Sequence, residues 1–295
     1  MEELIRYITQ GLSLGLIYGV VALGFVLVYK SSRILNFAVG EFLLIGAYIA
    51  WTSRVTWHLP AALCFLITVI VAIILGLVLE RVAIRPLIGQ PILGVIMMTL
   101  ALMVILRGGV LLAWGAIAKV YEPRLFPAAP IHLGGLIIRQ EYVWGFVVAV
   151  LMLIILTYFF RFTKAGLAMR ATSEDHQLAR GTGIRVKTVF AQSWVICAVV
   201  AGIAGIILAS MTNVTIDLAN VGLKSIAVVL VGGLESVPGA IVAGLIIGVA
   251  EGLASGYIDP LVGGGIAEVF AYALAVVSLI IWPYGLFGLR RIERI

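Results

Sequence analysis

The sequence predicts an all-α fold, a polytopic membrane helix bundle with about eight membrane segments, some of them short or broken. Its composition excludes a water-soluble domain, because 63% of the 295 residues are hydrophobic and only 12% are charged, about half the charged fraction of soluble proteins. Apolar runs of about 20 residues, the length of a membrane-spanning helix, recur along the chain. The alternating pattern of a transmembrane barrel is absent. We therefore expect a single transmembrane domain over residues 1–295, embedded in a lipid bilayer.

Apolar segments follow one another along the chain and form the expected helices. Most of them have the length that a helix needs to cross the hydrocarbon core. In order, the segments are residues 11–29, 37–51, 61–79, 91–113, 142–160, 190–210, the broken region 222–257, and 266–282.

Two of these segments are unusual, because one is short and the other is interrupted. The segment 37–51 gives roughly 22 Å of helix against a hydrocarbon core of about 30 Å, and Asn36 before it is a good N-cap. The region 222–257 contains a Ser-Val-Pro-Gly sequence, in which Pro238 suits the first turn of a new helix and Ser236 its N-cap. Pairs of short or interrupted segments are typical of a transport site. A re-entrant structural hairpin fits the pattern equally well.

Small residues recur at every fourth position in the first segment and again after Pro238. Such a spacing forms a smooth ridge on one helix face, where another helix can approach closely. We interpret both ridges as packing surfaces. The first consists of Gly11, Gly15 and Gly19, and the second of Ala240, Gly244, Gly248, Gly252 and Gly256.

Few charged residues lie within or beside the apolar segments. They are Glu41, Glu80, Arg107, Glu235, Glu251 and Glu268. A charge at membrane depth is expensive and therefore indicates a functional site that faces protein or water. We expect Glu41 and Arg107 to lie inside the bundle, where they could form a pair, and Glu80 to lie at a helix end near the interface.

The sequence indicates no catalytic centre, cofactor or metal site. No lysine follows a glycine, so the phosphate-binding G-x-x-x-x-G-K-[ST] loop of ATPases is missing. The three histidines lack metal-ligand spacing, and the two cysteines lie inside apolar segments. The net charge of +6 arises from basic residues at the ends of apolar runs, as in membrane proteins generally. We therefore expect no nucleic-acid partner.

The longest polar stretch, residues 161–187, fixes the expected orientation in the membrane. It contains six of the 20 Lys and Arg residues. Placing it in the cytoplasm puts most of the other basic residues in cytoplasmic loops as well, as the positive-inside rule requires. The N-terminus is then outside and the C-terminus is cytoplasmic.

Within this stretch, residues 172–181 predict a short helix of about two turns. Thr172 to Asp175 fits a capping box, and Gly181 and Gly183 provide a stop. A short rigid helix tied at both ends to membrane helices can transmit a push from a soluble partner. A plain cytoplasmic anchor explains the composition equally well.

Five sequence stretches stand out in a fixed order along the chain. They are ILNFAVGEFLLIGAYIA (34–50), ERVAIRPL (80–87), GLAMRATSEDHQLARGTGI (166–184), LKSIAVVLVGGLESVPGAIVAGLIIGVAE (223–251) and WPYGLFG (282–288). Together they resemble the permeases of ABC transporters for branched-chain amino acids, the LivH/LivM family. The resemblance runs almost from end to end, and several motifs in order are more specific than any one of them.

This resemblance implies a pore-forming subunit of an ATP-driven importer for branched-chain or other hydrophobic amino acids, in a bacterial cell (inner) membrane. It also implies the partners: a homologous permease subunit, two cytoplasmic ATPase subunits that hold the segment 161–187, and an extracytoplasmic substrate-binding protein. We expect the substrate path at Asn36, Val39, Gly40, Glu41, Ser236, Pro238 and Gly239. We expect the ATPase contact at Ala171, Glu174, Asp175, Ala179, Arg180 and Gly183.

Two alternatives stay open. Val39 stands where the resemblance leads us to expect a polar residue, often His or Gln, and relatives of the family carry urea, short amides and other small solutes. A stand-alone, ion-coupled secondary transporter is the rival from another class. It would need carboxylates in register inside the membrane, and the sequence has few.

Overall fold

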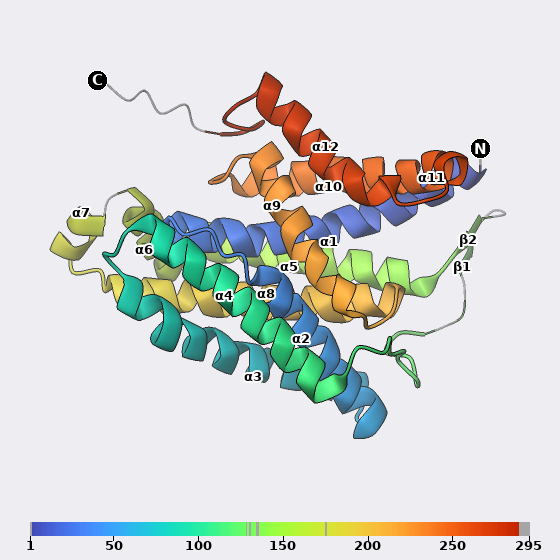
Figure 1. Cartoon of the computed structure of the whole chain (residues 1–295), viewed down its shortest axis with the longest axis horizontal. Coiled ribbons are helices and arrows are strands. Elements are labelled where there is room, and N and C mark those ends of the chain that lie inside the picture. The colour runs from blue at the N-terminus through green and yellow to red at the C-terminus, as the bar shows by residue number, and fades with distance from the viewer. Residues whose placement is uncertain (1, 128, 130, 134–135, 175, 289–295) are drawn as a thin grey trace.

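The computed structural model describes residues 2–288 except residues 128, 130, 134, 135 and 175. It confirms the predicted all-α helix bundle (Figure 1). Among the described residues, six helices are long and apolar enough to cross a membrane. The helices in chain order are α1 (Glu2–Ser32), α2 (Val39–Trp51), the π-helix η1 (Thr52–Thr56), α3 (Ala61–Leu79), the π-helix η2 (Glu80–Ile84), the 3-10 helix η3 (Arg85–Leu87), α4 (Ile92–Trp114), α5 (Gln140–Phe162), α6 (Lys164–Glu174), α7 (His176–Gly181), α8 (Val186–Met211), the 3-10 helix η4 (Ile216–Ala219), α9 (Asn220–Gly232), α10 (Val237–Leu253), the π-helix η5 (Ala254–Ile258), α11 (Asp259–Val262) and α12 (Ile266–Ile281).

Helix α1 runs through the middle of the bundle and packs against α10, α8, α9 and α5 (Figure 1). Every residue from Leu16 to Val28 is buried. Helices α3 and α4 lie at an edge of the bundle and turn large apolar side chains outward; Leu112, for example, is 92% exposed. Apolar surface of this extent suits a hydrocarbon environment.

The two predicted glycine ridges pack against each other, along the contact between α1 and α10. A Cβ atom on Gly11 would lie 2.6 Å from the carbonyl oxygen of Gly248, and one on Gly15 would lie 2.6 Å from that of Gly244. The two backbones are in direct contact at these positions, which is the packing expected of small residues in membrane helices.

Glu80 follows the last residue of α3, as predicted, but the chain continues there in the helical turns η2 and η3. Glu80 is fully buried. Its carboxylate accepts a charge-assisted hydrogen bond from Nη2 of Arg85 at 2.7 Å. The π-helical turn brings these two side chains together, and the pairing stabilises the buried charge.

The loop between α4 and α5 folds over the end of α2. It contains a short antiparallel hairpin of β1 (Ile131–Leu133) and β2 (Leu136–Ile138), which the sequence did not predict. The hydroxyl of Tyr121 donates to the carbonyl oxygen of Ala47 at 2.9 Å. Burial raises the pKa of Tyr121, so its phenol stays protonated and keeps this donor role.

Candidate functional site

Helix α2 begins inside the bundle, after a non-helical segment at residues 33–38. Asn36 lies in this segment and is fully buried. Its Oδ1 accepts a hydrogen bond from the backbone N–H of Ala38 at 3.0 Å, which closes an Asx turn. The predicted N-cap at Asn36 is therefore wrong: Ala38 occupies the N-cap position, with no side-chain hydrogen bond, and the helix begins at Val39. The amide of Asn36 instead shapes the turn that leads into the helix.

The first turn of α2 meets the first turn of α9. A Cβ atom on Gly40 would lie 2.1 Å from the carbonyl oxygen of Ala219, and one on Gly222 would lie 2.4 Å from the backbone nitrogen of Gly40. Only glycine at both positions allows this approach. The side chain of Val39 lies at its edge, with Cγ1 3.4 Å from the Cβ position on Gly222. We call this contact the α2–α9 junction; it joins the N-terminal ends of two short helices, both of which carry partial positive charge.

The α2–α9 junction lies at the middle of the bundle. Asn36 places its Nδ2 3.9 Å from the sulfur of Cys197, near the middle of α8. A few residues farther along, Gly46 of α2 packs on Gly202, and Gly205 packs on Leu43, again with backbones in contact. Because α8 is a 26-residue membrane-spanning helix, its centre corresponds to the centre of the membrane.

Glu41 and Arg107 form the ion pair that the sequence suggested. Nη2 and Nε of Arg107 lie 2.8 and 3.0 Å from Oε1 of Glu41. The carboxylate is buried, whereas the side chain of Arg107 is 32% exposed. Oε2 of Glu41 has no hydrogen-bond partner among the described residues. The pair ties the first turn of α2 to α4, beside the junction.

Ser236, Pro238 and Gly239 lie at the opposite end of α9. Oγ of Ser236 accepts a hydrogen bond from the N–H of Gly239 at 3.0 Å, so the predicted N-cap of α10 is confirmed, with Pro238 in the first turn. Gly239 packs on the backbone of Gly232, the last residue of α9. The length of α9, roughly 20 Å, separates this turn from the junction. The structure therefore does not bring the two predicted groups of path residues together.

Ala219 to Gly222 belong to the junction, and the sequence interpretation missed them. It placed the start of the broken region at residue 222 and did not consider a helix N-terminus there. Asp217 and Asn220 are the signal that could have revealed it, because polar residues at these positions interrupt the apolar sequence between α8 and α9.

The polar segment contains two helices, α6 and α7, in place of the one predicted helix. Thr172 and Ser173 lie near the end of α6, and their hydroxyls donate to the carbonyl oxygens of Ala168 and Arg170, both at 2.7 Å. The predicted capping box is therefore wrong, because its Thr172 would have to precede the helix. Asp175 lies outside the described residues.

The predicted stop after α7 is confirmed. Gly183 has φ +86, the left-handed conformation that glycine favours. The N–H of Ile184 donates to the carbonyl oxygen of Ala179, and the N–H of Gly183 donates to that of Arg180, both at 3.0 Å. This is the Schellman arrangement of a helix C-terminus.

The side chains predicted to contact an ATPase differ in exposure. Glu174, Arg180 and Gly183 are exposed, Ala171 is partly buried, and Ala179 packs inward. Glu174, Arg180 and Gly183 thus offer an accessible surface.

Arg33 connects this polar segment to the bundle. Its Nη2 donates to the carbonyl oxygen of Ser173 at 2.8 Å, and its Nη1 pairs with the carboxylate of Glu235. Since Arg33 follows α1 and Glu235 precedes α10, one guanidinium joins the end of α6 to the turn between α9 and α10.

Comparison with known proteins gives a consistent result. The model of the family described as "Branched-chain amino acid transport system / permease component" matches residues 7–282. The chain is 30% identical to the high-affinity branched-chain amino acid transport system permease protein LivH of Salmonella typhimurium, with 100% of this chain and 99% of that protein covered. It is 29% identical to the corresponding permease protein BraD of Pseudomonas aeruginosa, with 100% of both covered.

One solved structure supports the fold. PsaBC from Streptococcus pneumoniae, in complex with Fab, superposes with a TM-score of 0.53 over 97% of this chain and 94% of that chain, at 14% sequence identity. At this identity the similarity establishes a shared arrangement of helices.

Proposed function

Because the chain belongs to the family of branched-chain amino acid transport system permease components, we propose that it forms the membrane pore of an ATP-driven importer for branched-chain or other hydrophobic amino acids. The transmembrane part is a single domain. ATP hydrolysis takes place on separate ATPase subunits. This chain supplies the substrate path and the surface that contacts those subunits.

The α2–α9 junction is the observation that carries this proposal. Two helix N-termini meet at the centre of the bundle, where their partial positive charges favour a passing carboxylate. Asn36, Val39, Gly40 and Glu41 lie on the α2 side of this path. In the structure the backbones touch, so the junction closes the path, and the helices must separate for a substrate to pass. The role of Ser236, Pro238 and Gly239 in the path stays a prediction.

The proposed orientation rests on the positive-inside rule, which places α6 and α7 with their basic residues on the cytoplasmic side. The N-terminus is then outside and the C-terminus in the cytoplasm. Two cytoplasmic ATPase subunits engage these helices through Glu174, Asp175 and Arg180. A homologous permease subunit completes the pore, and an extracytoplasmic binding protein delivers the substrate from the side of the α4–α5 loop.

Two buried ion pairs favour ATP-driven transport over an ion-coupled mechanism. Glu41 is paired with Arg107, and Glu251 is paired with Lys224. Both carboxylates are thus engaged by a cation, whereas an ion-coupled path needs carboxylates that are free to exchange a proton or an ion. Uptake into vesicles that contain the permeases without the ATPases, driven by an ion gradient, would show the rival mechanism.

The proposed coupling is tested by reversing two charges. Glu174→Lys together with Asp175→Lys should reduce substrate-stimulated ATP hydrolysis to its basal level in the reconstituted transporter, because repulsion replaces attraction at the ATPase contact. The permease should still fold and purify. Normal stimulation in this variant would refute the assignment.

A matched control makes the same change of charge on the opposite side of the membrane. Glu3 and Glu122 are exposed, and Glu3→Lys together with Glu122→Lys should leave the stimulation within about twofold of the wild type, since surface charges far from a contact contribute little. Equal loss in both double variants would indicate a general effect of charge on insertion.

A further inference from the structure

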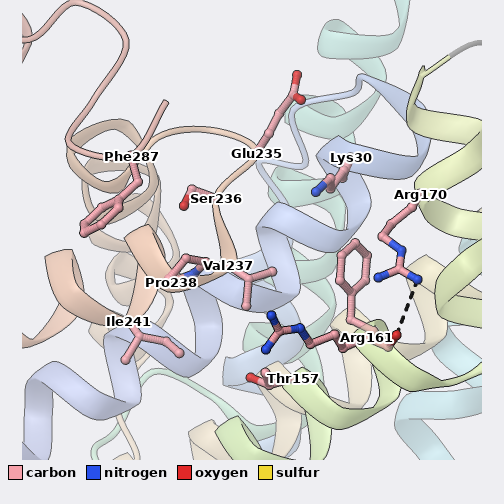
Figure 2. A pocket seen from close by; sticks show the side chains of 11 residues that line it. Lys30, Thr157, Arg161, Arg170, Glu235, Ser236, Val237, Pro238, Ile241 and Phe287 are labelled. Carbon is pink, nitrogen blue, oxygen red and sulfur yellow. Dashed lines mark hydrogen bonds between the residues drawn. The ribbon is translucent and has the colours of Figure 1, made fainter. Parts of the chain in front are cut away.

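A cavity of about 580 Å³ lies between the C-terminal ends of α1 and α5 and the first turn of α10. Figure 2 shows its two sides: basic side chains of α1, α5 and α6 on one, and the turn before α10 with its mostly apolar side chains on the other. The lining residues are Lys30, Thr157, Phe160, Arg161, Arg170, Glu235, Ser236, Val237, Pro238, Ile241 and Phe287.

Three cations line this cavity, against a single carboxylate. Lys30, Arg161 and Arg170 come from three different helices. Glu235 is the one acidic residue of the lining, and its carboxylate is paired with Arg33. The cavity therefore carries a local excess of positive charge.

An aromatic ring holds two of the cations near each other. The Nζ atom of Lys30 lies 4.9 Å from the ring centroid of Phe160, and the guanidinium carbon of Arg170 lies 5.7 Å from the same centroid. Nη2 of Arg170 also donates to the carbonyl oxygen of Arg161 at 3.4 Å. These contacts position the cations without neutralising their charge. The N-terminus of the 17-residue α10 adds partial positive charge from the other side of the cavity.

The surroundings of the cavity are apolar. Val237, Pro238, Ile241 and Phe287 form the side opposite the cations. The adjoining outward face of α5 exposes large apolar side chains, among them Ile154 (58%), Tyr158 (62%) and Phe162 (69%). A ligand in this place meets cations at one end and hydrocarbon-compatible surface at the other.

We propose that this cavity binds a phosphate ester, and that its source is the headgroup of an anionic phospholipid in the cytoplasmic leaflet. Arginine and lysine recognise phosphate through charge-assisted hydrogen bonds, and basic pockets between helices at the cytoplasmic interface are suited to anionic headgroups. The acyl chains extend along the apolar face of α5. A phosphate ester suits this lining better than an amino acid zwitterion, because the lining has three cations and its one carboxylate, that of Glu235, is paired with Arg33.

The bound headgroup connects the bundle to the coupling helices. It contacts α1 through Lys30, α5 through Arg161 and α6 through Arg170, so it holds α6 against the ends of two membrane helices. The lipid thereby stabilises one position of α6.

The test measures lipid binding to the full chain purified in detergent, by native mass spectrometry. Phosphatidylglycerol should bind at least tenfold more tightly than phosphatidylcholine, since each basic residue near an anionic headgroup contributes roughly 1 kcal/mol. Arg161→Gln with Arg170→Gln should remove most of this preference. Arg161→Lys with Arg170→Lys keeps the charge and should retain most of it.

Lys164→Gln with Arg185→Gln is the matched control, because both residues are exposed in the same polar segment and neither lines the cavity. It should keep the preference within about twofold. If sn-glycerol 3-phosphate displaces the lipid, the cavity is a phosphate site. Its ligand is then a soluble phosphate ester and not a lipid headgroup. An unchanged preference in the Gln double variant, or displacement of the lipid by leucine, would overturn the proposal. Binding is measured without transport, so the result does not depend on the proposed transport function.

Discussion

The bundle has two breaks that lead into a new helix, one before α2 and one before α10, and they are built differently. Before α2, Asn36 is fully buried, the helix has no side-chain cap, and Gly40 touches the backbone of α9. Before α10, Ser236 caps the helix and borders an open cavity. Both breaks pack on α9, at opposite ends.

This difference separates two tasks. The junction at α2 has no room for a side chain, so it can act as a closed point that opens only when helices move. The turn before α10 has a side-chain cap, an ion pair to Arg33 and adjoining free volume. It can change its contacts without disturbing the core. Helix α9 joins the two breaks.

Filling the junction should have the largest effect. In Gly40→Leu the new side chain would begin 2.1 Å from the carbonyl oxygen of Ala219, so α2 and α9 must separate, at an expense of more than about 3 kcal/mol. We expect leucine uptake by the reconstituted transporter to fall at least tenfold, because a small displacement of the residues that position a substrate can lower a rate by a large factor.

The control is Gly94→Leu in α4, because a Cβ atom at Gly94 meets no other atom within 4 Å. It adds the same apolar volume to a membrane helix and should leave both yield and uptake nearly unchanged. If Gly40→Leu retains normal uptake, the junction is not on the path.

Much of this arrangement could be predicted, and the limits have a physical reason. Composition and run length identified the helices, the four-residue glycine spacing identified the two packing faces that meet between α1 and α10, and the charges of Glu41 and Arg107 indicated a pair. These features depend on neighbours along one helix or on the high energy of a buried charge. The junction depends on where two distant turns meet, and no spacing within the sequence contains that information.

The capping assignments show the same limit on a smaller scale. Ser236 and Asn36 are both good N-cap residues by type, yet only Ser236 caps a helix. Thr172 and Ser173 fit a capping pattern and instead donate to carbonyl groups of α6. Short hydroxyl and amide side chains satisfy either arrangement, and tertiary packing decides between them.

Breaking the ion pair beside the junction should have an intermediate effect. Arg107→Gln leaves the carboxylate of Glu41 buried without a cation. The destabilisation should be roughly 1–3 kcal/mol, less than for a fully enclosed pair, because the side chain of Arg107 is 32% exposed. Thermal unfolding of the purified chain in detergent measures it.

The double variant Glu41→Gln with Arg107→Gln is the matched comparison, since it removes both charges. It should recover part of the stability lost in Arg107→Gln, and the double-mutant cycle gives the coupling between the two side chains. If Arg107→Gln alone is as stable as the wild type, the pair does not stabilise the start of α2.

Removing the cap before α10 should have the smallest effect and should stay local. Ser236→Ala deletes the acceptor for the N–H of Gly239, which destabilises the first turn of α10 by about 1 kcal/mol. Hydrogen exchange of the amides at residues 237, 239 and 240 should then rise about fivefold, whereas Ser236→Asp, which keeps an acceptor, should leave it near the wild-type rate. The amides at residues 39–42 should exchange as before, because α9 separates them from this turn. A rise at both places would mean that the two breaks open as one unit, and α9 would then be a rigid connection between the turn before α10 and the junction.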